Sequence, residues 1–160
     1  MNDFAVSSGL DPADLPAVAS LLAAGLEQAW DEPSLAQIAA LPNSFIVLAR
    51  PTEIAGAAVG AALCRVAAGE CELLALAVRP GCAGQGVGAA LVQACLDRAA
   101  QAGAARMVLE VADDNLAARR LYARFGLTDV GRRRHYYRRG DGARCDAVIM
   151  ARRLPDAAKP

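Results

Sequence analysis

The 160-residue sequence lacks the features that would place a protein in a membrane or direct it out of the cell. Residues 1–12 contain neither the basic segment nor the apolar segment of a signal peptide. A membrane-spanning helix needs roughly 20 consecutive apolar residues, and the longest candidate, residues 54–64, is much shorter. We therefore expect a cytoplasmic protein with no membrane partner.

Cysteine and histidine are too few, and too poorly spaced, for a disulfide framework or a zinc site. The five cysteines are odd in number and show no C-x-x-C spacing, and His135 is the only histidine. We therefore expect free thiols in a reducing compartment and no metal. Cys82 lies beside a glycine-rich segment, but the sequence places no base near it, so we do not expect a covalent role.

The net charge is zero overall, but the charged residues are unevenly distributed along the sequence. Lysine and arginine balance aspartate and glutamate at 17 each, so no general attraction to nucleic acid is expected. Residues 1–78 carry two arginines against nine acidic residues, and residues 79–160 carry 15 basic residues against eight acidic ones. The basic part would suit a polyanionic cofactor and the acidic part a cationic substrate, although solvated surface charges alone could give the same count.

Length and hydrophobic content predict one domain over residues 1–154, with a frayed tail at 155–160. Hydrophobic periodicity, capping residues and turn residues predict a mixed α/β sheet with helices. The predicted strands cover residues 4–9, 44–50, 53–65, 72–78, 106–112, 127–137 and 144–154, and those at 44–50 and 53–65 form a hairpin. The predicted helices run from Asp11 to about residue 24, from near Asp31, and over residues 86–101 and 115–125.

The most informative segment joins an apolar strand to a glycine-dense turn and then to a helix start. Gly84, Gly86 and Gly88 lack a Cβ atom, so the backbone can bend and bring N–H groups close to an anion, where the helix dipole adds positive charge. A phosphate-binding loop is therefore predicted. A dinucleotide fingerprint, Gly84-x-Gly86-x-x-Ala89 with Glu110 as its ribose-binding acid, is an alternative, as is a plain tight turn. The order of elements disfavours the dinucleotide interpretation because three consecutive strands directly precede the loop and two end the chain.

The same segment resembles the pyrophosphate loop of the GNAT family of acyl-CoA N-acyltransferases. That family has Gln/Arg-x-x-Gly-x-Gly/Ala after a Val-x-Pro strand end. Here Val78-Arg79-Pro80 precedes Ala83-Gly84-Gln85-Gly86-Val87-Gly88, with Ala83 in place of the usual Gln or Arg. Later segments resemble the RimI branch of the family: Leu109-Glu110-Val111, Asn115, residues 121–127, Arg133-Arg134-His135-Tyr136-Tyr137, Asp141-Gly142 and residues 146–150.

This resemblance implies an acetyl-CoA N-acetyltransferase with the GNAT fold, an α/β (α+β) architecture with a mixed, mostly antiparallel central sheet flanked by helices. It implies main-chain contacts to acetyl-CoA from Leu76, Ala77 and Val78, and a pyrophosphate cradle formed by Gly84, Gln85, Gly86, Val87, Gly88 and Ala89. Asn115 would add a cofactor contact, although Asn at a helix start is more often an N-cap. An apolar core strand would look the same as the contact strand at residues 76–78.

The resemblance also assigns Glu110 as the base and Tyr122 as the acid. Glu110 is a carboxylate in an otherwise apolar strand, where burial would suit it to base catalysis; a glutamate paired with an arginine is the alternative. Tyr122 lies seven residues after Asn115, so both should project from one helix face. A phenol with a pKa of about 10 can protonate a thiolate of about 8.5 only where that charge develops beside it. A plain core role for Tyr122 is the alternative.

The acceptor is expected to be a protein N-terminus. At pH 7, deprotonating an α-amine costs about 1 kcal/mol, against about 4.6 kcal/mol for a lysine. The RimI resemblance implies a ribosomal-protein N-terminal alanine, with Tyr136 and Tyr137 beside the basic residues 132–134 at the peptide entrance, where an amphipathic edge strand is the alternative. A GNAT enzyme acting on lysine or a small amine, and a non-catalytic acyl-CoA-binding module, remain as alternative functions.

Overall fold

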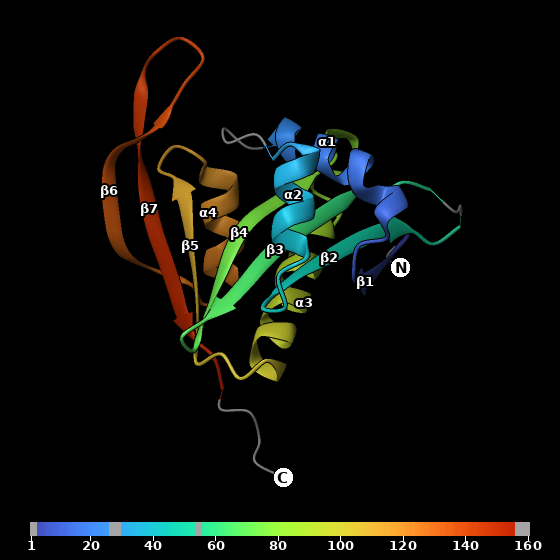
Figure 1. Cartoon of the computed structure of the whole chain (residues 1–160). Coiled ribbons are helices and arrows are strands. Elements are labelled where there is room, and N and C mark those ends of the chain that lie inside the picture. The colour runs from blue at the N-terminus through green and yellow to red at the C-terminus, as the bar shows by residue number, and fades with distance from the viewer. Residues whose placement is uncertain (1–2, 26–29, 54–55, 156–160) are drawn as a thin grey trace.

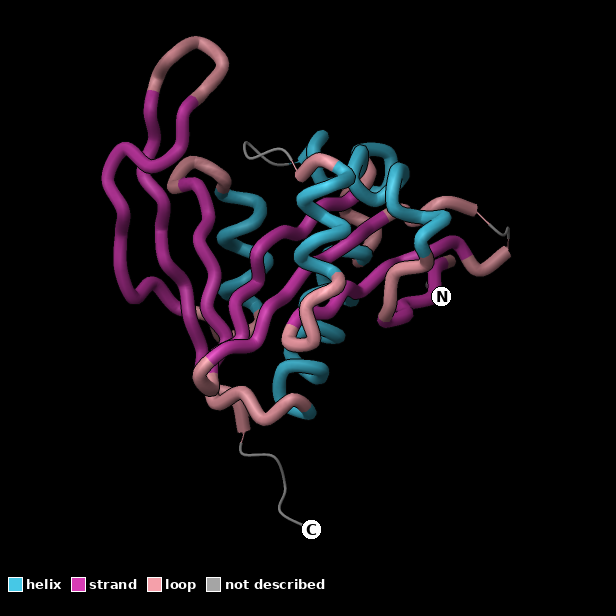
Figure 2. The backbone as a smooth tube through the Cα atoms, viewed as in Figure 1, coloured by secondary structure: helices cyan, strands magenta, loops and turns pink. Residues whose placement is uncertain are grey.

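The computed structural model describes residues 3–25, 30–53 and 56–155. In these residues, seven strands form one sheet in the order β1-β2-β3-β4-β5-β7-β6, with helices packed on it (Figures 1 and 2). The strands are β1 (Phe4–Ser8), β2 (Ser44–Pro51), β3 (Gly60–Ala67), β4 (Glu70–Val78), β5 (Arg106–Ala112), β6 (Thr128–Arg138) and β7 (Arg144–Arg153). The α-helices are α1 (Leu15–Gly25), α2 (Glu32–Ala39), α3 (Val87–Gln101) and α4 (Leu116–Arg124).

The sheet is mostly antiparallel, as expected. Among the described strands only β4 and β5 pair in parallel, and α3 connects them. Parallel neighbours need such a crossover, whereas β6 and β7 join through a short turn. The sequence-based prediction of the fold class is confirmed.

Two hydrophobic clusters pack on the two faces of the sheet. One contains α3 residues and is bordered by α4, and the other contains α1 and α2 residues. In Figure 1, α1 and α2 lie in front of the sheet and α3 and α4 behind it. The predicted helix repeat is confirmed, because Val87, Leu91, Cys95 and Ala99 are all buried. Strands β2, β3 and β4 contribute residues to both clusters and are therefore covered on both faces.

A bulge in β4 reverses which side chains face α3. Leu63 pairs with Ala75 but Cys64 pairs with Leu73, which leaves Leu74 as an extra residue. Before the bulge Leu73 packs in the α3 cluster, and after it Leu76 contacts that cluster. One inserted residue exchanges the two faces of a strand and bends it.

The sheet splits at the same place. β4 pairs with β5 only from Glu70 to Leu73, while β5 stays paired with β7 up to Ala112. Beyond Leu73 the two strands diverge, which gives the sheet an open V shape in Figure 1. Because β4 continues to Val78 with only β3 beside it, one of its backbone edges faces the opening.

Two predicted elements differ from the structure. The second strand of the predicted hairpin begins at Gly60 rather than at residue 53. Its pairing with β2 starts next to this residue, where Val59 N donates to Ala49 O at 2.8 Å. Residues 54–55 of the predicted strand lie outside the described residues. Asp11 caps a 3₁₀ turn, Pro12–Asp14, and α1 follows it. The other predicted elements are present within a few residues of the predicted bounds.

None of the helices in the described ranges is long and apolar enough to cross a lipid bilayer.

Candidate active site

The glycine loop leads directly from the end of β4 into α3. After the 3₁₀ turn Pro80–Cys82, Gly84 and Gly86 adopt φ values of +76° and +86°, which glycine favours. Gly86 is the N-cap of α3 and provides no side-chain cap. The first N–H groups of a helix have no partner within it, so this helix start can bind an anion. Gln85 Nε2 donates to Gly81 O at 3.1 Å and closes the loop.

Substituting Gly86 with alanine is expected to lower the free energy of unfolding by about 1 kcal/mol, because a Cβ atom strains a residue at positive φ. The matched control is Gly81→Ala in the same loop. Gly81 has no positive φ, and a Cβ atom added there would meet open space, so its substitution should be close to neutral. Urea denaturation measures both variants. Equal stability of the two would contradict a strain requirement at Gly86.

Gly88 has a different role from the other two glycines. A Cβ atom there would lie 3.1 Å from Leu121 Cδ2 of α4, closer than most such contacts. Its φ is not in the positive region. Gly88 therefore allows α3 and α4 to pack closely, instead of bending the loop.

A cavity of about 380 Å³ lies in the split between β4 and β5. It brings together five residues predicted from the sequence, although they come from β4, β5, the α4 region and β6: Leu76, Glu110, Asn115, Tyr122 and Tyr137. The lining residues are Leu76, Glu110, Val111, Ala112, Asp114, Asn115, Ala118, Leu121, Tyr122, Tyr137 and Arg139.

Glu110 and Tyr122 reach this cavity from different faces of the sheet. Leu109 and Val111 belong to the α3 cluster, and strand alternation therefore points Glu110 to the other face. Tyr122 belongs to the α3 cluster itself. Only where the sheet is split can both side chains line one cavity.

The Glu110 carboxylate is partly buried and has a cationic partner. Its side chain is 23% exposed, and its Oε1 atom lies 2.8 Å from Nε of Arg133. The carboxylate is therefore both partly buried and paired with an arginine, so the two environments considered from the sequence occur together. Arg133 was not predicted as its partner, because β6 meets β5 only through β7.

The Tyr122 phenol is almost fully buried, at 7% exposure. Burial raises the pKa of Tyr122 well above its ordinary value, and the nearby Cys95, Tyr137 and Cys64 add smaller increases. The phenol therefore keeps its proton at neutral pH. Tyr122 also packs in the core, so the core role and the cavity position are compatible.

Residues 15–127 match the model of the acetyltransferase (GNAT) family. The chain belongs to this family. GNAT acetyltransferases use acetyl-CoA, and the split sheet and glycine loop described above agree with membership.

Individual GNAT relatives extend the similarity over most of the chain. The [ribosomal protein bS18]-alanine N-acetyltransferase of Escherichia coli K12 is 33% identical over 144 residues, which cover 90% of this chain and 94% of the relative. The crystal structure of the corresponding E. coli enzyme has a TM-score of 0.84 at 31% identity and covers 98% of this chain and 97% of its own. The structure of yncA from Salmonella typhimurium, solved with acetyl-CoA, has a TM-score of 0.80 at 21% identity, covering 99% and 98%.

Asn115 caps α4 and also lines the cavity that contains Glu110 and Tyr122. Its Oδ1 accepts a hydrogen bond from Ala118 N at 3.1 Å. The capping alternative is therefore confirmed. Because the cap uses the carbonyl oxygen, the amide NH₂ group is the part of the side chain that could contact a ligand.

A bulge in β6 lies between Arg133, which pairs with Glu110, and Tyr137, which lines the cavity. Regular pairing with β7 is interrupted between Arg133 and Tyr137. In this bulge His135 has a φ of +54°, and its N–H donates to Asp146 Oδ1 at 2.9 Å. That hydrogen bond, followed by one from Arg132, lowers the pKa of Asp146. The bulge leaves Arg133 on Glu110 and Tyr137 in the cavity lining.

The basic run at residues 132–134 is divided in function. Arg132 Nη1 lies 2.8 Å from Asp113 and 3.1 Å from Asp146, so it ties β6 to the β5–α4 loop and to β7. Arg133 stacks over Tyr136 at 5.2 Å from its ring centroid while it pairs with Glu110. Tyr136 meets Tyr137 edge to face, with ring centroids 5.1 Å apart. Arg132 therefore links the strands and loop around the cavity, and Arg133 contacts a residue that lines it.

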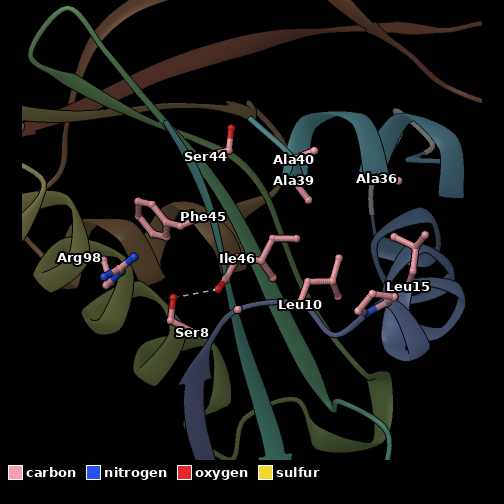
Figure 3. Close-up of a pocket in the computed structure, with 12 residues that line it drawn as sticks. Ser8, Leu10, Leu15, Ala36, Ala39, Ala40, Ser44, Phe45, Ile46 and Arg98 are labelled. Atoms are coloured by element: carbon pink, nitrogen blue, oxygen red, sulfur yellow. Dashed lines mark hydrogen bonds between the residues drawn. The ribbon is translucent and has the colours of Figure 1, made fainter. Parts of the chain in front are cut away.

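A second, larger cavity of about 630 Å³ lies elsewhere, beside the N-terminal end of β2 (Figure 3). Among the described residues, neither an acidic side chain nor a tyrosine lines it. It therefore offers neither the base nor the acid that acetyl transfer to an amine requires.

Proposed function

We propose that this GNAT acetyltransferase moves the acetyl group of acetyl-CoA to the N-terminal α-amine of a protein, with a ribosomal protein that begins with alanine as its target. The observation that carries the proposal is the cavity in which Glu110 and Tyr122 meet at the split of the sheet. The 33% identity to the bS18-alanine N-acetyltransferase of E. coli supports the choice of acceptor.

The residues present fit acetyl-CoA. The uncapped start of α3, with residues Gly84 to Ala89, would hold the pyrophosphate through backbone N–H groups. Ala83 has no polar side chain, so this cradle depends on the main chain. β4 no longer pairs with β5 at Leu76, Ala77 and Val78. Main-chain groups of these residues could therefore contact the pantetheine arm. Asn115 lines the same cavity as Leu76. When bound, acetyl-CoA supplies a polarised thioester and a thiolate leaving group.

Glu110 and Tyr122 would perform the two proton transfers of the reaction. Glu110 takes the proton from the acceptor amine as the new N–C bond forms. Tyr122 gives its proton to the sulfur as the C–S bond breaks. The proton count balances, since one proton is removed from nitrogen and one is delivered to sulfur.

The two residues also argue against the alternative functions. A non-catalytic acyl-CoA-binding module would not need both groups in one cavity. Deprotonating an α-amine at neutral pH costs less than deprotonating a lysine by about 3.6 kcal/mol, so a single carboxylate suits the α-amine. The exposed Tyr136 beside Tyr137 offers an aromatic contact for a peptide at the entrance.

Thiol release from acetyl-CoA tests the acceptor. Peptides that begin with Ala, Ser and Met are compared with an N-acetylated Ala peptide of the same sequence and with free lysine. We expect the Ala peptide to react fastest and the acetylated peptide not to react, because it has no free α-amine. Turnover on the blocked peptide, or on free lysine alone, would overturn the proposal and favour a lysine or small-amine acetyltransferase.

A further inference from the structure

The larger cavity results from the way the first strands end. Gly9 N donates to Ile46 O at 2.9 Å. β1 stops at Ser8, which pairs with Val47, but β2 begins three residues before Val47, at Ser44. Gly9 has a φ of +113°, and the chain then turns away towards α1. A groove of about 630 Å³ remains between this turn, the start of β2 and the end of α2. Its size is in the range of small-molecule sites.

Most of the groove wall is apolar. Leu10, Leu15, Phe45 and Ile46 form one part of it. The α2 side consists of alanines at residues 36, 39 and 40, a spacing that places them on one helix face. Because alanine has the smallest side chain with a Cβ atom, this face does not fill the space in front of it.

The described residues that line the groove include one cation, Arg98, and no anion. Arg98 of α3 lies with its guanidinium carbon 5.5 Å from the centroid of Phe45, and no carboxylate among the described residues forms an ion pair with it. The Ser8 hydroxyl donates to Ile46 O at 3.3 Å. The Ser44 hydroxyl is buried, and within the described part of the chain it has no hydrogen-bond partner.

Charge and apolar surface lie at different ends of this groove. Figure 3 places Arg98 and Phe45 on one side, Leu15 and Ala36 on the other, and Ile46 between them. A ligand complementary to this arrangement has an anionic head and an apolar chain. We propose that the groove binds an unbranched aliphatic carboxylate, with the carboxylate on Arg98 and the chain extending over Ile46 towards Leu15.

This site does not depend on the proposed acetyl transfer, because it shares no lining residue with the cavity that contains Glu110 and Tyr122. Isothermal titration of the full chain, with saturating acetyl-CoA to occupy the transfer site, would measure binding of hexanoate and octanoate. Each methylene buried should tighten binding about three- to fourfold. Octanol and octylamine, which have the same chain but no carboxylate, should bind at least tenfold more weakly than octanoate.

Three variants locate the site. Arg98→Gln should weaken octanoate binding about tenfold, and Ala39→Phe should abolish it by filling the groove. Arg106→Gln is the matched control, since Arg106 is a half-exposed arginine paired with Glu70 away from the groove, and it should bind like the wild type. Arg98 is exposed, so Arg98→Gln should leave the fold intact. This variant therefore tests the binding site even if Ala39→Phe lowers the melting temperature.

The proposal is overturned by several outcomes. These are no octanoate binding, equal binding of octanol, or unchanged binding by Arg98→Gln. A peptide with an apolar end and a free C-terminal carboxylate that binds where octanoate does not would assign the groove to a protein partner instead. Acetyl transfer should be unchanged in Arg98→Gln, and that measurement is independent of whether octanoate binds.

Discussion

Tyr122→Phe is expected to reduce turnover by about 100-fold or more, while the affinity for acetyl-CoA changes little. Phenylalanine keeps the ring that packs in the core but removes the only proton that the side chain can give to the departing sulfur. The buried phenol is fully protonated at neutral pH, because burial raises its pKa. Steady-state thiol release gives the turnover, and titration of the free enzyme with acetyl-CoA gives the dissociation constant.

Stability measurements separate a catalytic effect of Tyr122→Phe from a folding effect. At pH 7 the free energy of unfolding should change by less than about 1 kcal/mol, since the ring remains. Because the pKa of Tyr122 is raised in the folded state, the wild type keeps its full free energy of unfolding below about pH 10, where a tyrosine in the unfolded chain titrates. As pH rises further, the free energy of unfolding of the wild type falls. The variant should lack this loss. An unaltered turnover would remove Tyr122 from the acid role.

Glu110→Gln is expected to lower kcat/KM for an acceptor peptide by about 100-fold at pH 7. Glutamine has nearly the same shape but cannot take a proton from the amine. The difference from the wild type should narrow above about pH 8, where the α-amine is already deprotonated in solution. A pH series of kcat/KM with the Ala peptide measures both effects.

Glu72→Gln is the matched control for Glu110→Gln. Glu72 also pairs with an arginine, Arg65, at 2.9 Å, but it lies on β4 outside the cavity lining. Loss of an exposed ion pair of this kind costs little, so the control should retain wild-type kcat/KM. If Glu110→Gln were as active as Glu72→Gln at every pH, Glu110 would not be the base. If activity required Glu110 but lysine were the better acceptor, Glu110 would remain the base and the proposed α-amine acceptor would be refuted.

Local sequence signals were sufficient for most of the elements, and the family resemblance supplied the candidate site residues. The helix repeat Val87, Leu91, Cys95 and Ala99 predicted the buried face of α3, because each of these residues lies about one turn from the next. Gly84 and Gly86 predicted a loop that needs positive φ angles. Glu110 and Tyr122 were proposed because a lone carboxylate in an apolar strand and a tyrosine seven residues after Asn115 matched the family pattern.

Contacts between distant residues decided the rest. The bulge at Leu74, the divergence of β4 and β5 after Leu73, and the groove beside Arg98 depend on strand register and on where neighbouring strands stop. Register is the outcome of many pairings across the sheet and has no local signal in an Ala/Gly-rich strand. The Arg133–Glu110 pair has the same origin, since it joins strands that are separated by β7.

By itself, the sequence determined the helices, most of the strands, the glycine loop and the candidates for the acid and the base, because capping, periodicity and glycine conformation act over a few residues. Only the tertiary structure decided that the sheet opens where these residues meet, that Glu110 and Tyr122 arrive from opposite faces, and that Arg133 is the partner of Glu110. These features arise from packing between segments far apart in the chain, and no short stretch of sequence encodes them.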